Sequence, residues 1–143
     1  MGCFFIDIQN TFHFDSKLWS NKDELNIPGG KTGLDSQETK LPTYWNTPFS
    51  KICLGMKIGH QTKFTVIDVH ASSLYSLIAD GHYRSTSLSR DRHTWNTLIG
   101  SHPSLQRKCI KEGFSASRTR IGYAGNNEND CKSYDSITHI EPV

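Results

Sequence analysis

The stretch that decides the fold is Lys51-Ile-Cys-Leu-Gly-Met-Lys-Ile58, then Gly59-His-Gln61, then Thr62-Lys-Phe-Thr-Val-Ile-Asp-Val69. Two runs rich in apolar and β-branched residues flank a short turn that contains glycine, which is the pattern of a β-hairpin. Side chains alternate along a strand, so Phe64 and Val66 fall on one face of the second run. The stretch therefore predicts two antiparallel strands.

Segments that follow the hairpin add short helices and one more strand. Ser72–Ala79 has apolar residues at helical spacing, but it is short and stays ambiguous between helix and loop. Residues 90–99 are predicted to be a helix with an apolar stripe around Trp95. Thr119–Ala124 is predicted to be the final strand. Residues 101–117 are predicted to be irregular, with two core contacts, Leu105 and Phe114.

The N-terminal region, residues 1–27, is the least decided part of the chain. Phe4–Ile8 leans toward β-structure, and Thr11–Asp15 alternates apolar with polar residues as a half-buried strand does. Residues 34–48 are polar and are predicted to form an irregular surface segment. Its two docking side chains are predicted to be Tyr44 and Trp45.

Length and composition predict one loop-rich, strand-biased domain. The chain has 143 residues, of which 35% are hydrophobic and 10% aromatic, so it can form a core. A formal net charge of +2 provides no strong field for nucleic acid, which we exclude as a partner. No apolar run approaches the roughly 18 residues of a membrane span.

The run Asn126-Asn-Glu-Asn-Asp130 is the strongest candidate for a binding site. It follows an apolar stretch that ends at Gly125, and Cys131 closes it. Amide and carboxylate oxygens can hydrogen-bond sugar hydroxyls, and they are also the ligands that calcium prefers. The predicted ligand-binding residues are Asn126, Asn127, Glu128 and Asn129. The alternative is a plain polar turn, which asparagine and aspartate also favour.

A calcium site in this run would have to be of an irregular kind. The EF-hand pattern fails, because Cys131 stands where glycine is needed at position six and Ile137 where glutamate is needed at position twelve. A site of another type remains open, with calcium as the cofactor. Its predicted metal ligands are Glu128, Asp130 and Asp135.

Four cysteines leave the pairing undetermined. They stand at positions 3, 53, 109 and 131, form no Cys-x-x-Cys pair, and allow three complete pairings. An even number in a loop-rich chain suits an oxidising compartment, although a reduced chain is also consistent with these spacings.

Recognised catalytic motifs are lacking, so the sequence favours a protein that is not an enzyme. No serine lies in a Gly-x-Ser-x-Gly turn, and the seven histidines form no His-Glu-x-x-His pair. The alternative is a hydrolase that uses a histidine with an aspartate. Its first candidate residues would be His70, Asp80 and His82.

Two segments carry a family resemblance. One is Leu41-Pro-Thr-Tyr-Trp-Asn-Thr-Pro-Phe-Ser-Lys-Ile-Cys-Leu-Gly-Met-Lys57, continuing through Ser73-Leu-Tyr-Ser-Leu-Ile-Ala-Asp-Gly81. The other is Cys109-Ile-Lys-Glu-Gly-Phe114 with Arg120-Ile-Gly-Tyr-Ala-Gly-Asn-Asn-Glu-Asn-Asp-Cys131. Over roughly residues 18–135 the chain resembles the uncharacterised skeletal-organic-matrix-type extracellular proteins of corals and sea anemones. Some of those are similar to fibrinogen-like C-terminal domains and intelectin-type lectins.

The resemblance implies a fold, a location and a role. The implied fold is a strand-rich α+β fragment of the fibrinogen-like kind, with a twisted antiparallel sheet, one or two short helices and long loops. The implied location is extracellular, although the chain carries no signal peptide. The implied role is lectin-like binding of calcium, glycan or a matrix protein without catalysis. Within this domain we predict a disulfide between Cys109 and Cys131.

Departures from the resembling proteins predict an incomplete domain. Those proteins often have cysteine where Thr47 stands here, so Cys53 is expected to lack a partner. They continue past the Asp-Ser pair into a glycine-rich stretch, whereas residues 136–143 form a divergent tail. Residues 1–143 are therefore expected to be a single, truncated copy. A fragment without independent activity is the third alternative.

Overall fold

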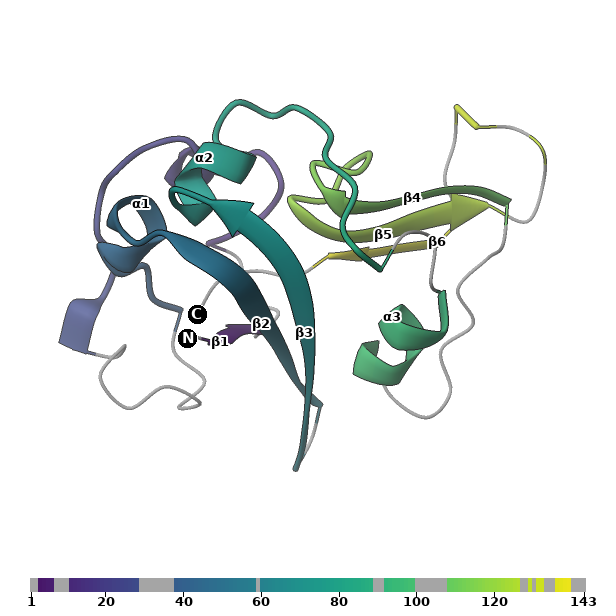
Figure 1. Ribbon diagram of the computed structural model, residues 1–143, viewed down its shortest axis with the longest axis horizontal. Helices are drawn as coiled ribbons and strands as arrows, with labels where there is room; N and C mark the ends of the chain where they lie inside the picture. Colours follow the sequence, from purple (N-terminus) through teal and green to yellow (C-terminus); the bar gives the residue numbers. More distant parts are fainter. Residues whose placement is uncertain are drawn as a thin grey trace.

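The described residues form two small three-stranded sheets and three short α-helices. The computed structural model describes residues 3–6, 11–28, 38–58, 60–88, 92–99, 108–126, 129, 131–132 and 136–139. The elements in chain order are β1 Cys3–Ile6, the 3-10 helix η1 Lys17–Trp19, α1 Thr43–Asn46, β2 Phe49–Ile58, β3 Gln61–Ala71, α2 Leu74–Ile78, α3 Arg92–Ile99, β4 Lys108–Phe114, β5 Ile121–Asn126 and β6 Ser136–His139. Figure 1 shows the β2–β3 hairpin in the middle and the sheet β4-β5-β6 beside it.

The predicted hairpin is confirmed. β2 and β3 pair antiparallel, with Ile58 opposite Gln61 at the turn and an irregularity between Phe49 and Lys51. β1 runs parallel to β2 and places Cys3 opposite Cys53. The buried face of β2 carries Ile52, Leu54 and Met56. Phe64 and Val66 do share one face of β3, but that face is the outer one, where they are 49% and 48% exposed.

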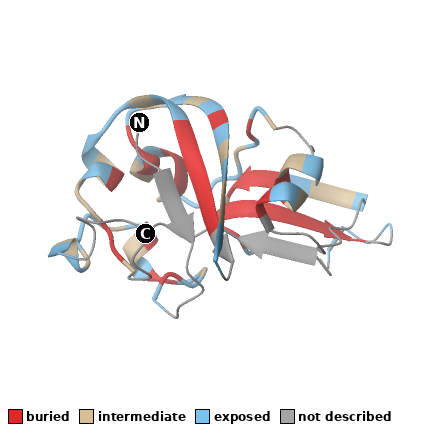
Figure 2. Cartoon of the chain, turned by 90° about the horizontal axis from the view of Figure 1, so that it is seen from below, coloured by how far each residue is buried: buried red, intermediate tan, exposed pale blue. Residues whose placement is uncertain are grey.

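Both predicted apolar helix stripes face the core. α2 resolves the ambiguity of residues 72–79 in favour of a helix, because Ser73 and Ser76 form a capping box with hydrogen bonds of 3.1 and 3.3 Å. α3 buries Trp95 and Leu98 and contacts β2 and β3. Large buried apolar residues of β2, β3, β4 and β5 and of these helices belong to one hydrophobic cluster, and Figure 2 shows buried residues running along the strands.

The second sheet corrects the expectation for residues 101–117. Residues 108–114 form β4, which pairs antiparallel with β5, although Glu112 and Gly113 disfavour a strand by themselves. Phe114 is fully buried as predicted, whereas Leu105 lies outside the described residues. β5 is buried along its whole length but is not the final strand. Four residues of the divergent tail form β6, which pairs antiparallel with β5.

The N-terminal segment also departs from the sequence-based expectation. Residues 11–15 form turns rather than a strand, and Phe12 packs edge-on against Trp19 with ring centroids 5.5 Å apart. The Tyr44 side chain docks as predicted, and its hydroxyl donates to the Trp19 carbonyl at 2.7 Å. Burial raises the pKa of Tyr44, with the positive charge of Arg120 opposing the shift. The fold is thus mixed α+β, with antiparallel strand pairs in two sheets instead of one.

Candidate functional site

The predicted binding residues begin at the last residue of β5 and continue along the chain toward β6. Asn126 is the last residue of β5 and lies opposite Lys108 of β4. Its side chain is buried and engaged in contacts, so it is placed to hold the start of the loop rather than to reach a ligand. Asn129 is exposed. Asn127 and Glu128 lie outside the described residues.

The predicted calcium ligands are Glu128, Asp130 and Asp135. Asp130 and Asp135, like Glu128, lie outside the described residues. Among the residues that the structure does describe, no three histidine, cysteine, aspartate or glutamate side chains come together in a way that could hold a metal ion. The calcium site therefore stays a prediction about this one loop.

A disulfide ties this loop to the neighbouring strand. Cys109 and Cys131 are bonded, with their Cα atoms 5.2 Å apart and a sequence separation of 22, which confirms the predicted pairing. Cys109 lies at the start of β4, where the register with β5 is irregular between Lys108 and Lys111. Closing a loop of this length stabilises the fold by about 3 kcal/mol in the chain-entropy account. The loop is therefore anchored at Cys131 as well as at the end of β5.

The expectation that Cys53 lacks a partner is wrong. Cys53 is disulfide-bonded and buried within the first sheet. The resembling proteins often have a cysteine at the position of Thr47, but that difference says nothing about other partners for Cys53. The bond of Cys53 depends on which strand lies beside β2. The parallel strand β1 brings another backbone segment to that position.

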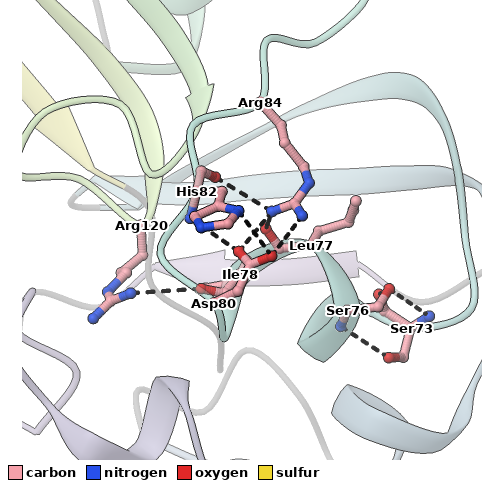
Figure 3. Close-up of polar contacts among 8 residues, drawn as sticks. All are labelled: Ser73, Ser76, Leu77, Ile78, Asp80, His82, Arg84 and Arg120. Carbon is pink, nitrogen blue, oxygen red and sulfur yellow. Dashed lines mark hydrogen bonds and ion pairs between the residues drawn. The ribbon is translucent and has the colours of Figure 1, made fainter.

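Two of the three residues of the alternative hydrolase site, Asp80 and His82, lie in an ion-pair cluster with Arg84, drawn in Figure 3. Both terminal nitrogens of Arg84 donate hydrogen bonds to the Asp80 carboxylate, at 2.6 and 2.8 Å. His82 contributes its backbone N–H at 2.9 Å, and its ring Nδ1 lies 3.6 Å from the same carboxylate. Hydrogen bonds from Arg84, then from the His82 backbone, hold the pKa of Asp80 well below its usual value. Such a carboxylate is a weak base.

His70 belongs to a different element from this cluster. It is an exposed residue near the end of β3, whereas Asp80 and His82 follow α2. The structure therefore brings together two of the three candidate hydrolase residues, and it engages the aspartate with an arginine. This arrangement fits an electrostatic clamp on the chain after α2 better than a proton-transfer site.

Arginines that cap α2 were missed by sequence reasoning. Arg84 donates to the Leu77 carbonyl at 2.8 Å, and Arg120 donates to the Ile78 carbonyl at 3.5 Å (Figure 3). Both arginines therefore contact backbone carbonyls at the C-terminal end of α2. Arg120 also donates to the Phe14 carbonyl at 2.9 Å and lies 4.8 Å from that ring. The available signal was the placement of Arg84 shortly after a helical stretch.

The Asp80 clamp predicts a pH-dependent contribution to stability. Because the pKa of Asp80 is lowered in the folded state, its stabilising effect is complete above its ordinary value of 3.8 and is lost as the pH falls further toward the folded-state pKa. We expect Asp80→Asn to be less stable than the parent at pH 7 in urea unfolding, and this difference to shrink at pH 3. A constant difference from pH 7 to pH 3 would contradict the assignment.

Asp68→Asn is the matched control for that experiment. Asp68 pairs with Lys51 at 3.5 Å, but both side chains are mostly exposed. Exposed pairs of this kind contribute little. The stability of Asp68→Asn should therefore follow that of the parent at every pH.

No protein-family model, curated protein or solved structure matched the chain in the three comparisons made. In the described part of the chain, no helix is both long and apolar enough to cross a membrane. The functional interpretation accordingly depends on the loop, its disulfide and the sequence resemblance.

Proposed function

We propose that this protein is a non-enzymatic extracellular recognition or matrix-associated protein of the fibrinogen-like class, and that the β5–β6 loop carries its ligand contact. The observation that supports this most is the Cys109–Cys131 disulfide beside a run of amide and acid side chains. A covalent anchor reduces the conformational entropy that a loop loses on binding, so it favours recognition.

The chemistry of the loop favours calcium or a glycan as the ligand. Asn126 is buried at the end of β5, and Asn129 is exposed, so the described part of the loop runs from the core to the surface. Carboxylates of Glu128 and Asp130 would supply the charge that a calcium ion needs. The disulfides support an extracellular location, because such bonds persist in oxidising compartments.

Calcium binding is tested by titration calorimetry of the intact chain with calcium chloride. We expect the parent to bind and the Glu128→Gln/Asp130→Asn variant to bind at least about tenfold more weakly, since a calcium site depends on its carboxylates. Asp23→Asn/Glu24→Gln is the matched control, because it makes the same charge change at two exposed residues elsewhere. Equal heats from parent and loop variant would remove these side chains from the site.

Glycan binding is tested separately with a panel of immobilised oligosaccharides. Asn129→Ala should reduce the signal of any sugar that the parent binds, whereas Asn46→Ala, at an exposed residue of α1, should leave it unchanged. A parent that binds neither calcium nor any sugar of the panel would contradict the proposed ligand classes. If Asn129→Ala and Asn46→Ala bind a sugar equally well, Asn129 does not contact that sugar.

A further inference from the structure

The disulfides of this protein lie in opposite environments. Cys53 is only 4% exposed and sits in the middle of β2, between two other strands. Cys131 is exposed at the outer end of the second sheet, and Cys109 is partly buried at the start of β4. A reductant has to reach a sulfur atom before exchange can begin, so access to the two bonds differs greatly.

We propose that the Cys109–Cys131 disulfide is a redox-sensitive latch, opened by a dithiol reductant while the Cys53 disulfide stays closed. A thiolate of the reductant attacks the exposed Sγ of Cys131, the bond to Cys109 breaks, and Cys109 leaves as a thiolate that takes up a proton. The second thiol of the reductant, as its thiolate, then displaces Cys131, which is protonated in turn. Two electrons and two protons pass to the protein, and the reductant becomes a disulfide.

Local charge favours this exchange. Lys108 and Lys132 each stand next to one of the two cysteines in sequence, and both are exposed. A nearby cation stabilises a thiolate, which makes Cys109 a better leaving group in the first step. The buried surroundings of Cys53 provide no comparable stabilisation of a charged sulfur.

Backbone geometry indicates what opening would change. Cys109 has a φ of 53°, in the left-handed region that residues with a side chain rarely adopt, and it lies within the irregular register of β4 and β5. The disulfide is the covalent tie between this position and the segment that leads into β6. Once it opens, Cys109 can leave that conformation, and the pairing of β4 with β5 loosens at that end. Opening of the Cys109–Cys131 disulfide does not depend on which ligand the loop binds.

Selectivity is tested on the intact chain treated with graded dithiothreitol for a fixed, short time. Free thiols are trapped with N-ethylmaleimide and assigned by peptide mass spectrometry. We expect labels on Cys109 and Cys131 at reductant concentrations at least about tenfold below those that label Cys53. Labelling of Cys53 at the same or a lower concentration would overturn the proposal.

Hydrogen exchange tests the conformational consequence. At the concentration that opens only the latch, amides of residues 108–112 and 136–139 should exchange at least about tenfold faster, while β2 and β3 stay unchanged. The Cys109→Ser/Cys131→Ser variant should exchange in the same way without reductant. Unchanged exchange in the selectively reduced parent would show that the bond is not a latch, and this test does not require the variant to fold.

Discussion

Replacing Gly113 with alanine is expected to lower the free energy of unfolding by more than about 3 kcal/mol, because a β-carbon has no room there. An ideal Cβ at this position would lie 2.3 Å from the Arg84 carbonyl oxygen and 3.1 Å from Ser85 Cα. Both neighbours are backbone atoms, so rotation of a side chain cannot relieve the clash. Gly113 also has a φ of 114°, which strains any residue other than glycine.

The Gly113 substitution acts on the seam between two chain segments that are distant in sequence. Arg84 and Phe114 exchange backbone hydrogen bonds of 2.9 and 2.8 Å beside it, and these would have to shift. Chemical unfolding monitored by tryptophan fluorescence measures the effect. A loss below about 1 kcal/mol would mean that the backbone at Gly113 and Arg84 moves apart at little cost, which would contradict the expected clash.

Gly81→Ala is the matched control for this substitution. Gly81 also has a positive φ, 73°, but the nearest atom to an added Cβ is a terminal nitrogen of Arg120 at 4.0 Å. Only the backbone conformation is penalised, so the expected loss is about 1 kcal/mol. The difference between the two variants isolates the contribution of the close approach at Gly113.

Replacing Lys40 with methionine is expected to cost about 2–3 kcal/mol of unfolding free energy. Lys40 is only 2% exposed, and its ammonium group donates to the Leu18 carbonyl at 2.6 Å and to the Asn21 carbonyl and side chain at 2.8 and 2.6 Å. Methionine keeps the length and apolar stem of the side chain but leaves all three acceptors without this donor. Burial lowers the pKa of Lys40, which the negative charge of Asp23 partly offsets.

Lys22→Met provides the control for the lysine experiment. Lys22 is exposed and lies 5.1 Å from the centre of the Tyr75 ring, a contact worth roughly 0.5–1 kcal/mol at such a site. The same chemical change should therefore cost no more than about 1 kcal/mol there. Equal losses in the two variants, measured by urea unfolding at pH 7, would contradict a structural role for the buried ammonium group.

Local pattern was enough to predict the elements that carry their own signal. The hairpin of β2 and β3 and the stripe around Trp95 follow from side-chain period and turn residues, which act within a few positions. Residues 72–79 stayed ambiguous in the sequence, and the capping box of Ser73 and Ser76 in the structure decided in favour of α2. β4 was missed because Glu112 and Gly113 do not look like strand residues. Glu112 is buried only because Thr86, 26 positions earlier, donates to its carboxylate at 2.9 Å from its backbone N–H and 2.5 Å from its hydroxyl.

The candidate site likewise has features that the sequence shows and features that only the tertiary structure sets. The amide and acid run of 126–130 could be seen in the sequence, and the resemblance supplied its disulfide. That Asn126 is buried while Asn129 is exposed could not be predicted, because it depends on where β5 ends against β4. The bond of Cys53 was hidden for the same reason, since it depends on a strand paired from the N-terminal region.

The sequence by itself determined a loop-rich, strand-biased chain built around one hairpin, with an amphipathic helix around Trp95 and a polar run closed by Cys131. These features arise from interactions between residues close together in the chain. Only the tertiary structure decided that the strands form two sheets, that Gly113 must lie against Arg84, and that Lys40 becomes a buried donor. Each of these depends on contacts across roughly 20 to 50 positions, and local propensity carries no record of them.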